Sequence, residues 1–297
     1  MSLDMTQEIR DKMNISLRDV TADDIAACAQ ICHEAFTDMA EKHNFPTDFP
    51  STAVAEGMLN FMVGNPGFYG VVAELDGEIV GSNFLDERGE IIGLGPITVS
   101  VNGQNSGVGK VLMQHCIDRS REHDARGVRL LQAAYHNRSL SLYTRLGFDV
   151  QDVLSTLQGP AINLSIDGYS VRLAEAADIE ACNSLCRQAH GHDRQQELQD
   201  AVDADMATVA ESDGTIRGFS TLLGYTGFSV AENNDALKAL IGAAREFVGP
   251  GILVPSGNGD VMRWCLEHGL RVIQQMTLMT TGYFQRPTTP YMPSILY

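Results

Sequence analysis

Apolar residues change their spacing along the chain in a regular order. Alternating or continuous apolar runs, which are typical of strands, are separated by segments whose apolar residues recur every three or four positions, as in amphipathic helices. In the first half these patterns predict a strand at 15–18, helices from 21 and at 51–63, strands at 70–75, 78–85 and 91–101, a helix at 108–121, a strand at 127–134, a short helix from 137 and a strand at 150–157. This order predicts an α+β fold, with a mixed, mostly antiparallel twisted sheet flanked by helices.

The predicted strand at 91–101 contains an interruption. It includes Gly95-Pro96, and proline cannot donate a hydrogen bond to a neighbouring strand. We therefore expect a bulge or a local separation of strands at this point.

The turn after that strand is the strongest chemical signal in the chain. It consists of Gln104, Asn105, Ser106, Gly107, Val108, Gly109 and Lys110 and leads directly into the helix at 108–121. The first turn of a helix has about four backbone N–H groups without helical acceptors and carries a partial positive charge, so it suits an anion. Two glycines can take positive φ and let a phosphate approach the amides. The turn is therefore a candidate phosphate-binding loop.

Two other phosphate-binding motifs do not fit the spacing of this loop. A P-loop requires Ser or Thr after the lysine, but Val111 follows Lys110. A dinucleotide-binding fingerprint requires a third glycine where the chain has Leu112. An ordinary turn between a strand and a helix remains the alternative.

The second half of the chain repeats the pattern of the first. Residues 169–186 match 15–32 at a constant offset of 154, 208–220 match 71–83, and 269–270 match 147–148. We expect a tandem duplication with domains at 1–160 and 161–297, joined by a linker at 161–168. The second copy has no glycine pair at 231–236, and Cys265 stands in place of Tyr143, with Gly259 or Asn258 in place of Asn137. This half is expected to be structural or to shape the substrate site.

Composition limits the classes of partner. The 297 residues carry a formal charge of −17, which argues against nucleic acid and against an anionic membrane surface. No apolar run approaches the roughly twenty residues of a membrane span, and the polar N-terminus is unlike a signal peptide, so we expect a cytoplasmic protein. Residues 104–145 nevertheless hold seven basic and three acidic residues, as expected either for attraction of a polyanion or for a solvated helix face.

The six cysteines do not form a recognisable metal motif. There is no C-x-x-C pair, and Cys28/Cys32 and Cys182/Cys186 lie at helical spacing within apolar segments. Core packing is favoured over metal ligation, and no metal cofactor is predicted.

The Gln-x-x-Gly-x-Gly loop resembles a motif of the GCN5-related N-acetyltransferase superfamily. Val99 precedes it, and Asn137 to Phe148 follow it in the order the family shows, although the family usually has Arg in place of Gln104. The resemblance implies acetyl-CoA as co-substrate and two GNAT-like domains, the first intact. It also implies that cofactor-binding groups are Ile97, Val99, Gln104, Asn105, Ser106, Gly107, Val108, Gly109, Lys110, Asn137 and Tyr143.

By the same resemblance Tyr143 is the general acid for the departing thiolate. Proton transfer from a tyrosine near pKa ~10 to a thiolate near ~8.5 is uphill by about 2 kcal/mol, so a hydrogen bond to the sulfur is the milder role. Core packing is the structural alternative for this side chain. The general base is open between ordered water and four carboxylates, namely Glu34, Asp38, Glu87 and Glu90.

These observations favour an N-acetyltransferase that acts on a primary amine of a small molecule or peptide. The alternative from another class is a non-catalytic acyl-CoA-binding sensor or assembly module. Tandem acetyltransferases such as mycothiol synthase keep an active second copy, whereas here the first copy has the intact motifs, so that substrate is not transferred. A homodimer is one assembly that the second copy could serve.

Overall fold

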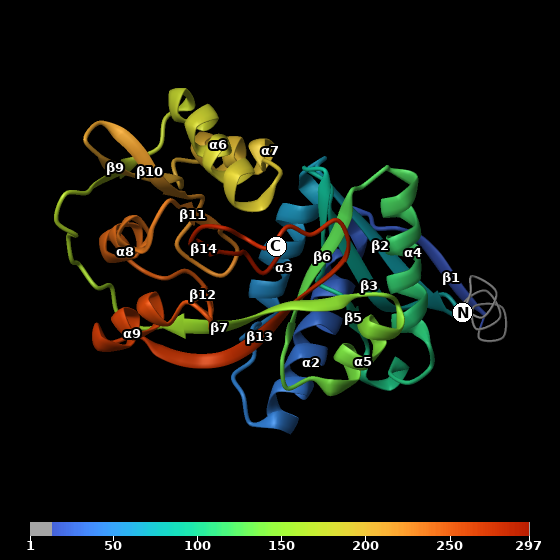
Figure 1. Cartoon of the computed structure of the whole chain (residues 1–297). Coiled ribbons are helices and arrows are strands. Elements are labelled where there is room, and N and C mark those ends of the chain that lie inside the picture. Colours follow the sequence, from blue (N-terminus) through green and yellow to red (C-terminus); the bar gives the residue numbers. More distant parts are fainter. Residues whose placement is uncertain (1–13, 297) are drawn as a thin grey trace. The chain divides into compact units, whose positions relative to one another are not determined.

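The computed structural model describes residues 14–296, which form two compact units (Figure 1). Unit 1 comprises residues 14–128 and 138–147, and unit 2 comprises 129–137 and 148–296. The contacts therefore divide the chain at a different place from the sequence repeat, whose second copy begins after residue 160. None of the helices within 14–296 is long and apolar enough to cross a membrane.

Unit 1 contains a small antiparallel sheet and four main helices. Its elements are β1 (Ile15–Asp19), η1 (Ala22–Asp24), α2 (Ile25–His43), α3 (Thr52–Gly64), β2 (Phe68–Leu75), β3 (Glu78–Asp86), β4 (Ile91–Leu94), β5 (Thr98–Val99), η2 (Val101–Gly103), α4 (Val108–Glu122) and α5 (Asn137–Arg145), the last of which begins in unit 2. The strand order is β1-β2-β3-β4, and β5 also pairs with β3. The β2–β3 hairpin turns at Asp76-Gly77, both with positive φ, as the sequence predicted.

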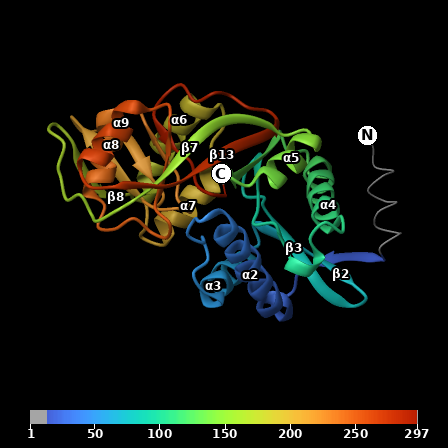
Figure 2. The same cartoon turned by 90° about the horizontal axis from the view of Figure 1, so that it is seen from below.

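Helices cover both faces of this sheet. α2 and α3 lie on one side of the β2–β3 ribbon and α4 on the other (Figures 1 and 2). Two consecutive residues of β3 explain the arrangement, because successive side chains of a strand point to opposite faces. Gly81 faces Val108 and Leu112 of α4, whereas Ser82 forms a hydrogen bond with Cys28 of α2.

The expected interruption of the fourth strand is present. Leu94 of β4 pairs with Leu85, and Thr98 of β5 pairs with Ser82, so the three residues 95–97 on one side oppose the two residues 83–84 on the other. The extra residue lies at 95–97, which belongs to neither strand. This β-bulge separates β4 from β5 just before the glycine loop.

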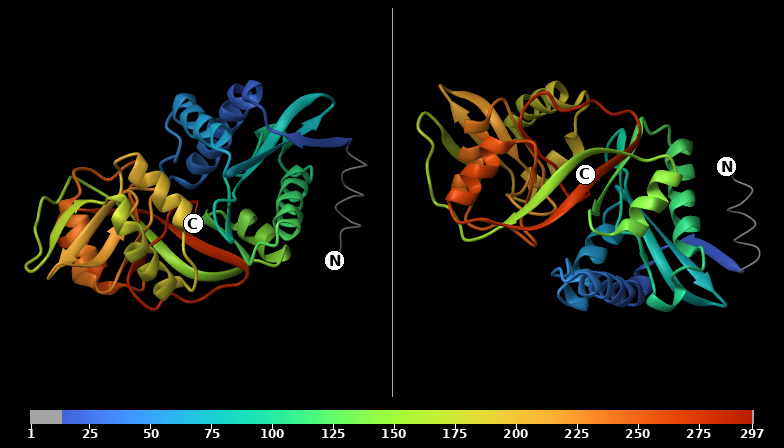
Figure 3. Two further views of the ribbon diagram at one scale, coloured as in Figure 1. Left: turned by 90° about the horizontal axis from the view of Figure 1, so that it is seen from above. Right: turned by 60° about the horizontal axis from the view of Figure 1, so that its bottom comes forward.

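Unit 2 is larger and has two groups of strands. Its elements are most of β6 (Gly127–Ala133), β7 (Asp149–Gln158), β8 (Ser170–Leu173), η3 (Ala176–Asp178), α6 (Ile179–His190), α7 (Gln195–Asp203), β9 (Thr208–Ser212), β10 (Thr215–Ser220), β11 (Ser229–Ala231), α8 (Asn234–Ala243), β12 (Ile252–Pro255), α9 (Gly259–Glu267), β13 (Arg271–Gly282) and β14 (Tyr291–Met292). One group runs in the order β6-β13-β7-β12 and the other β14-β11-β10-β9-β8. β7 and β13 are paired along most of their length (Figure 3, green and red).

The second group of strands is covered on both faces by helices. Val209 and Val230 pack with α6 and α7, whereas their neighbours Ala210 and Ala231 pack with α8 and α9. Alternation along β9 and β11 therefore supplies two apolar clusters in unit 2.

The two halves of the chain share local details. Strand, 3-10 turn and helix follow each other at 15–43 and again at 170–190. Arg18 binds Asp24 at 2.7 Å, and Arg172 binds Asp178 at 2.6 Å, at the offset of 154 found in the sequence. Cys28, Cys32, Cys182 and Cys186 are all buried in α2 and α6, as core packing predicts.

Candidate active site

The glycine loop between β5 and α4 has a left-handed turn at its centre. Gly107 precedes the helix with φ 95° and ψ −8°, and Asn105 also has a positive φ of 68°. Gly109, by contrast, lies within the first turn of α4 and is not among the glycines with positive φ. Of the two loop glycines, only Gly107 therefore needs to be glycine for backbone reasons.

The backbone amides at the start of α4 remain available. Within the described residues, no hydrogen bond satisfies the N–H groups of Val108, Gly109 or Lys110, and α4 has no side-chain cap. Earlier amides of the turn are used internally, since Gly103 and Ser106 donate to the carbonyls of Ser100 and Gly103. The loop thus presents a row of donors at the positive end of a helix, where an anion is stabilised.

Apolar side chains pack against the first turn of α4. A Cβ added to Gly109 would lie 3.7 Å from Cγ2 of Val99 and 3.9 Å from Cδ2 of Leu142. Val99 belongs to β5, and Ile97 lies in the bulge that precedes it. Val99 therefore packs against the start of α4, and Ile97 precedes it by two residues.

Helix α5 contributes Tyr143 and a basic residue. The guanidinium of Arg138 donates to Oδ1 of Asn105 at 3.3 Å, which ties α5 to the glycine loop. Tyr143 follows Leu142 and is buried. Burial raises the pKa of the Tyr143 hydroxyl, and its hydrogen bond with Ser139 opposes that effect. Asn137 is exposed at the start of α5, where its backbone N–H donates to the carbonyl of Tyr135 at 3.1 Å.

Five of the seven basic residues between 104 and 145 fall into two groups. Arg119 binds Glu87 at 2.7 Å, Arg121 binds Asp118 at 2.9 Å, and Arg126 binds Glu90 at 2.6 Å. These arginines balance acidic groups of unit 1, as the solvated-face interpretation expects. Lys110 and Arg138 belong to the loop itself or contact it, so the attraction of a polyanion rests on them.

The four carboxylates considered as general base are all engaged. Glu87 and Glu90 have the arginine partners just described, Asp38 binds Lys42 at 2.7 Å, and Glu34 accepts a hydrogen bond from Gln30 at 2.5 Å. Among the described residues, no group of three His, Cys, Asp or Glu side chains is placed to hold a metal ion.

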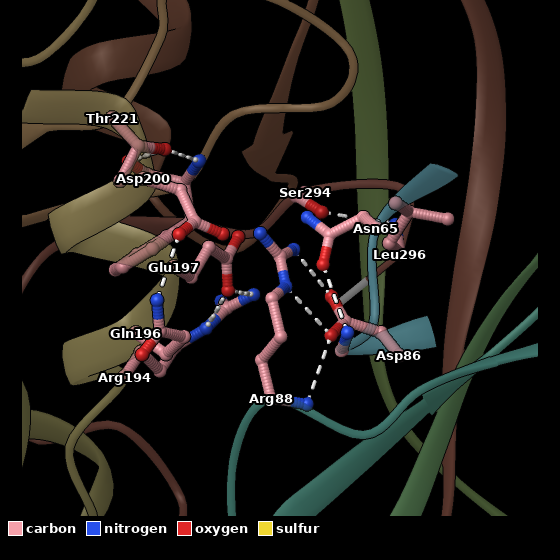
Figure 4. Close-up of polar contacts among 12 residues, drawn as sticks. Asn65, Asp86, Arg88, Arg194, Gln196, Glu197, Asp200, Thr221, Ser294 and Leu296 are labelled. Carbon is pink, nitrogen blue, oxygen red and sulfur yellow. Dashed lines mark hydrogen bonds and ion pairs between the residues drawn. The ribbon is translucent and has the colours of Figure 1, made fainter. Parts of the chain in front are cut away.

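Sequence analysis did not single out Asp86 and Arg88, although they form a buried pair at the end of β3. Both side chains are about nine-tenths buried, and Arg88 makes two hydrogen bonds to the carboxylate, at 2.8 and 2.5 Å (Figure 4). The guanidinium also lies 4.7 Å from the ring centre of Phe68. Asp86 and Arg88 are close in the sequence, but their burial is a tertiary property. Only the fold therefore reveals the pair.

The corresponding loop of the second half is closed by its own side chains. Asn233 caps α8 by accepting from the amide of Ala236 at 2.9 Å, and Asn234 and Asn258 exchange reciprocal side-chain hydrogen bonds. Glu232 binds Arg217 at 2.8 Å. The start of α8 thus has a side-chain cap that α4 does not have, and its nearby carboxylate is unfavourable for a phosphate.

Comparison with known proteins agrees with the geometry of unit 1. The model of the acetyltransferase (GNAT) family matches residues 29–148, from α2 through the glycine loop and α5. Residues 29–148 belong to the GNAT family. This membership supports acyl transfer as the general chemistry of the domain. No curated protein matches the chain.

Two solved structures are similar in fold to nearly the whole chain. A putative acetyltransferase from Pyrococcus horikoshii has a TM-score of 0.68 and 18% identity, over 91% of this chain and 89% of that one. A GCN5-related N-acetyltransferase from Sphaerobacter thermophilus has a TM-score of 0.61 and 17% identity, over 92% of this chain and 96% of that one. At this identity the likeness concerns the fold, and it includes the C-terminal half.

Proposed function

We propose that the protein is an acetyl-CoA-dependent N-acetyltransferase whose catalytic site lies in the GNAT domain of unit 1. The observation that carries the proposal is the uncapped start of α4, where Val108, Gly109 and Lys110 present unsatisfied amides after the left-handed Gly107. A pyrophosphate satisfies several such donors at once. Gln104, Asn105, Ser106 and Lys110 surround it, and the backbone at Ile97 and Val99 receives the pantetheine arm.

The acyl group would be delivered past the bulge at 95–97 toward Tyr143. The two separated strands leave backbone groups of Ile97 and Val99 for the cofactor, and Asn137 contributes a side-chain amide. The chemistry that the bound cofactor supplies is an activated thioester. The residues of unit 1 orient it, and attack of an amine on its carbonyl forms the amide and releases the thiol.

Tyr143 acts as a hydrogen-bond donor to the departing sulfur. Its raised pKa makes complete proton transfer to the thiolate still less favourable than the ~2 kcal/mol expected from unperturbed groups. A hydrogen bond from a neutral hydroxyl does not have this cost, and a neutral tyrosine is the form that burial favours.

The acceptor is a primary amine that reaches the site neutral or loses its proton to water. Removing the proton from an alkylammonium of pKa ~10.4 at pH 7 costs about 4.6 kcal/mol. Because the four candidate carboxylates already have partners, turnover at low amine concentration should rise about tenfold per pH unit between pH 7 and 9. A flat profile in that range would instead require a base within the site.

The C-terminal half is proposed to be a degenerate second GNAT copy. The shared order of elements and the matched Arg18–Asp24 and Arg172–Asp178 pairs support duplication. The cap by Asn233 and the replacement of Tyr143 by the buried Cys265 support loss of cofactor binding there. This half then shapes the acceptor site or an interface.

A non-catalytic acyl-CoA sensor is the second candidate, because the same loop could bind the cofactor without turnover. A thiol-release assay with acetyl-CoA and a panel of small amines and peptides separates the two. Release of CoA with any acceptor, abolished by removing the acceptor, supports the enzyme. Tight acetyl-CoA binding without release across the panel favours the sensor.

A further inference from the structure

The two copies of the duplication share strands within unit 2. β6 and β7 belong to the N-terminal copy at 1–160, and β12 and β13 belong to the C-terminal copy at 161–297. The strands run in the order β6-β13-β7-β12, so β13 lies between two strands of the N-terminal copy. In the same way β7 lies between two strands of the C-terminal copy. Each copy therefore holds a strand of the other.

The pairing of β7 with β13 is centred on one pair of residues. The sequence match of 147–148 with 269–270, just before these two strands, has an offset of 122. The same offset carries Leu154 of β7 onto Met276 of β13, and these two residues are paired with each other. Exchange of the two copies therefore leaves this pair in place.

The pairs on either side of the centre are exchanged in the same way. Gln158 pairs with Arg271, and moving both residues by the offset gives Asp149 and Thr280, which also form a pair. The other pairs follow the same rule. Each strand has one residue that the register skips, and these two residues also correspond, namely Gln151 and Ile273. The ribbon of β7 and β13 thus has an internal two-fold symmetry (Figure 3).

The outer strands β6 and β12 obey the same symmetry. Beyond β6, the backbone N–H of Ala134 donates to the carbonyl of Gln275 at 2.9 Å. Beyond β12, the N–H of Ser256 donates to the carbonyl of Val153 at 2.8 Å, and the offset of 122 relates the two bonds. A two-fold axis of this kind characterises an isologous interface between two copies of one chain. Unit 2 therefore contains the interface of a strand-exchanged dimer within a single chain.

One buried polar pair breaks this symmetry. The side-chain amide of Gln132 in β6 donates to the hydroxyl of Thr277 in β13 at 2.5 Å, and both residues are buried. The equivalent positions on the other side of the axis are Val254 and Ser155, which are paired in the sheet. Val254 has no polar side chain, and Ser155 instead forms a hydrogen bond with Ser256 at 2.9 Å. The N-terminal copy thus has a side-chain bond to its exchanged strand that the degenerate copy lacks at this position.

β13 also holds the segment that leads to Asn137. Ala134, which is bonded to Gln275, lies three residues before Asn137. Between them the chain turns tightly, since the backbone N–H of Asn137 donates to the carbonyl of Tyr135 at 3.1 Å. The position of Asn137 therefore depends on a strand of the C-terminal copy.

We infer that the degenerate copy supplies β13 as an exchanged strand, and that Gln132 and Thr277 are positioning residues for Asn137. The C-terminal copy is then the built-in dimer partner of the catalytic copy. The positioning role rests on the proposed function, in which Asn137 binds the cofactor arm.

The strand exchange can be tested without cofactor by cutting the linker between the copies. A protease recognition sequence is inserted after Asp167, which is exposed, and the full chain is cleaved under native conditions. Because each copy holds a strand of the other, we expect the two pieces to elute together in size-exclusion chromatography and to separate only in denaturant. Separation under native conditions would overturn the inference.

The positioning role is tested by calorimetric titration of acetyl-CoA into the uncut chain. Thr277→Val keeps the shape of the side chain but removes the oxygen to which Gln132 donates, and it should raise the Kd on the order of fivefold or more. Thr277→Ser keeps a hydroxyl and should bind like the unaltered protein. Ser155→Ala removes the hydroxyl at the equivalent place across the axis and should leave the Kd unchanged.

Chemical unfolding separates positioning from a general weakening of the sheet. Thr277→Val and Ser155→Ala each lose one buried side-chain hydrogen bond, so we expect both to lower the stability. An unchanged Kd in Thr277→Val, or an equal rise of the Kd in Ser155→Ala, would overturn the positioning role. If the unaltered protein does not bind acetyl-CoA, the proposed function fails together with that role, whereas size-exclusion of the cut chain still decides the strand exchange.

Discussion

Substituting alanine at the two loop glycines should have opposite effects. Gly107 has φ 95°, a region that costs a residue with a Cβ about 1–2 kcal/mol. If the loop keeps its shape in Gly107→Ala, the free energy of unfolding falls by that amount. If the loop instead adopts another shape without acetyl-CoA, this energy is required when the loop returns to its bound shape. The Kd for acetyl-CoA then rises roughly 5- to 30-fold.

Gly109→Ala is the matched variant, two residues away. Its added Cβ would meet Val99 and Leu142 at ordinary contact distances of 3.7 and 3.9 Å, and alanine is favoured over glycine within a helix by about 0.8–1.0 kcal/mol. We expect this variant to be slightly stabilised and to bind acetyl-CoA within about threefold of the unaltered protein.

Calorimetric unfolding measures the stability of both variants, and titration measures their affinity for acetyl-CoA. Gly57→Ala in α3, where nothing lies within 4 Å of the added Cβ, controls for a general effect of alanine in a helix. If Gly107→Ala matched Gly109→Ala in both stability and affinity, the left-handed turn would not be what shapes the loop.

Three other substitutions or treatments test separate parts of the account. Tyr143→Phe should lower kcat roughly 10- to 100-fold with little change in the Kd for acetyl-CoA, as expected for loss of one hydrogen bond to developing charge, and unchanged turnover would remove Tyr143 from the mechanism. Asp24→Asn should reduce stability at pH 7 by about 1–2 kcal/mol in chemical unfolding. Arg18 lowers the pKa of Asp24, so this difference should shrink as the pH falls below about 4, and a difference that persisted at lower pH would exclude the ion pair as its source. All six cysteines are buried, and burial raises the pKa of Cys28 to about 11 and of Cys265 to about 12, so fewer than about one thiol per chain should react with a thiol reagent at pH 8 before unfolding.

Local signals in the sequence were sufficient for the elements that build the loop. Asp76-Gly77 predicts the hairpin, Gly95-Pro96 the bulge, and the apolar spacing after Gly107 the helix, because each depends on a few neighbouring residues. The sequence allows positive φ at both loop glycines, whereas the structure has it at Gly107 only.

Features that depend on distant contacts were not predictable in this way. The pairing of β7 with β13 joins residues more than a hundred positions apart, and the buried Arg129 guanidinium lies 5.3 Å from the ring centre of the distant Phe284. The sequence also counted Arg119, Arg121 and Arg126 toward a positive region, although their carboxylate partners can be identified only from the fold. Burial and pairing of charges are tertiary properties, so composition alone cannot assign them.

The most direct test of the account is a calorimetric titration of acetyl-CoA into the full chain. We predict one site per chain, because α4 has open amides and α8 is capped by Asn233. Gly107→Glu, which places a carboxylate at the proposed phosphate position, should abolish that site. Two sites per chain, one unaffected by Gly107→Glu, or no binding at all, would contradict the assignment of a single cofactor site to the glycine loop.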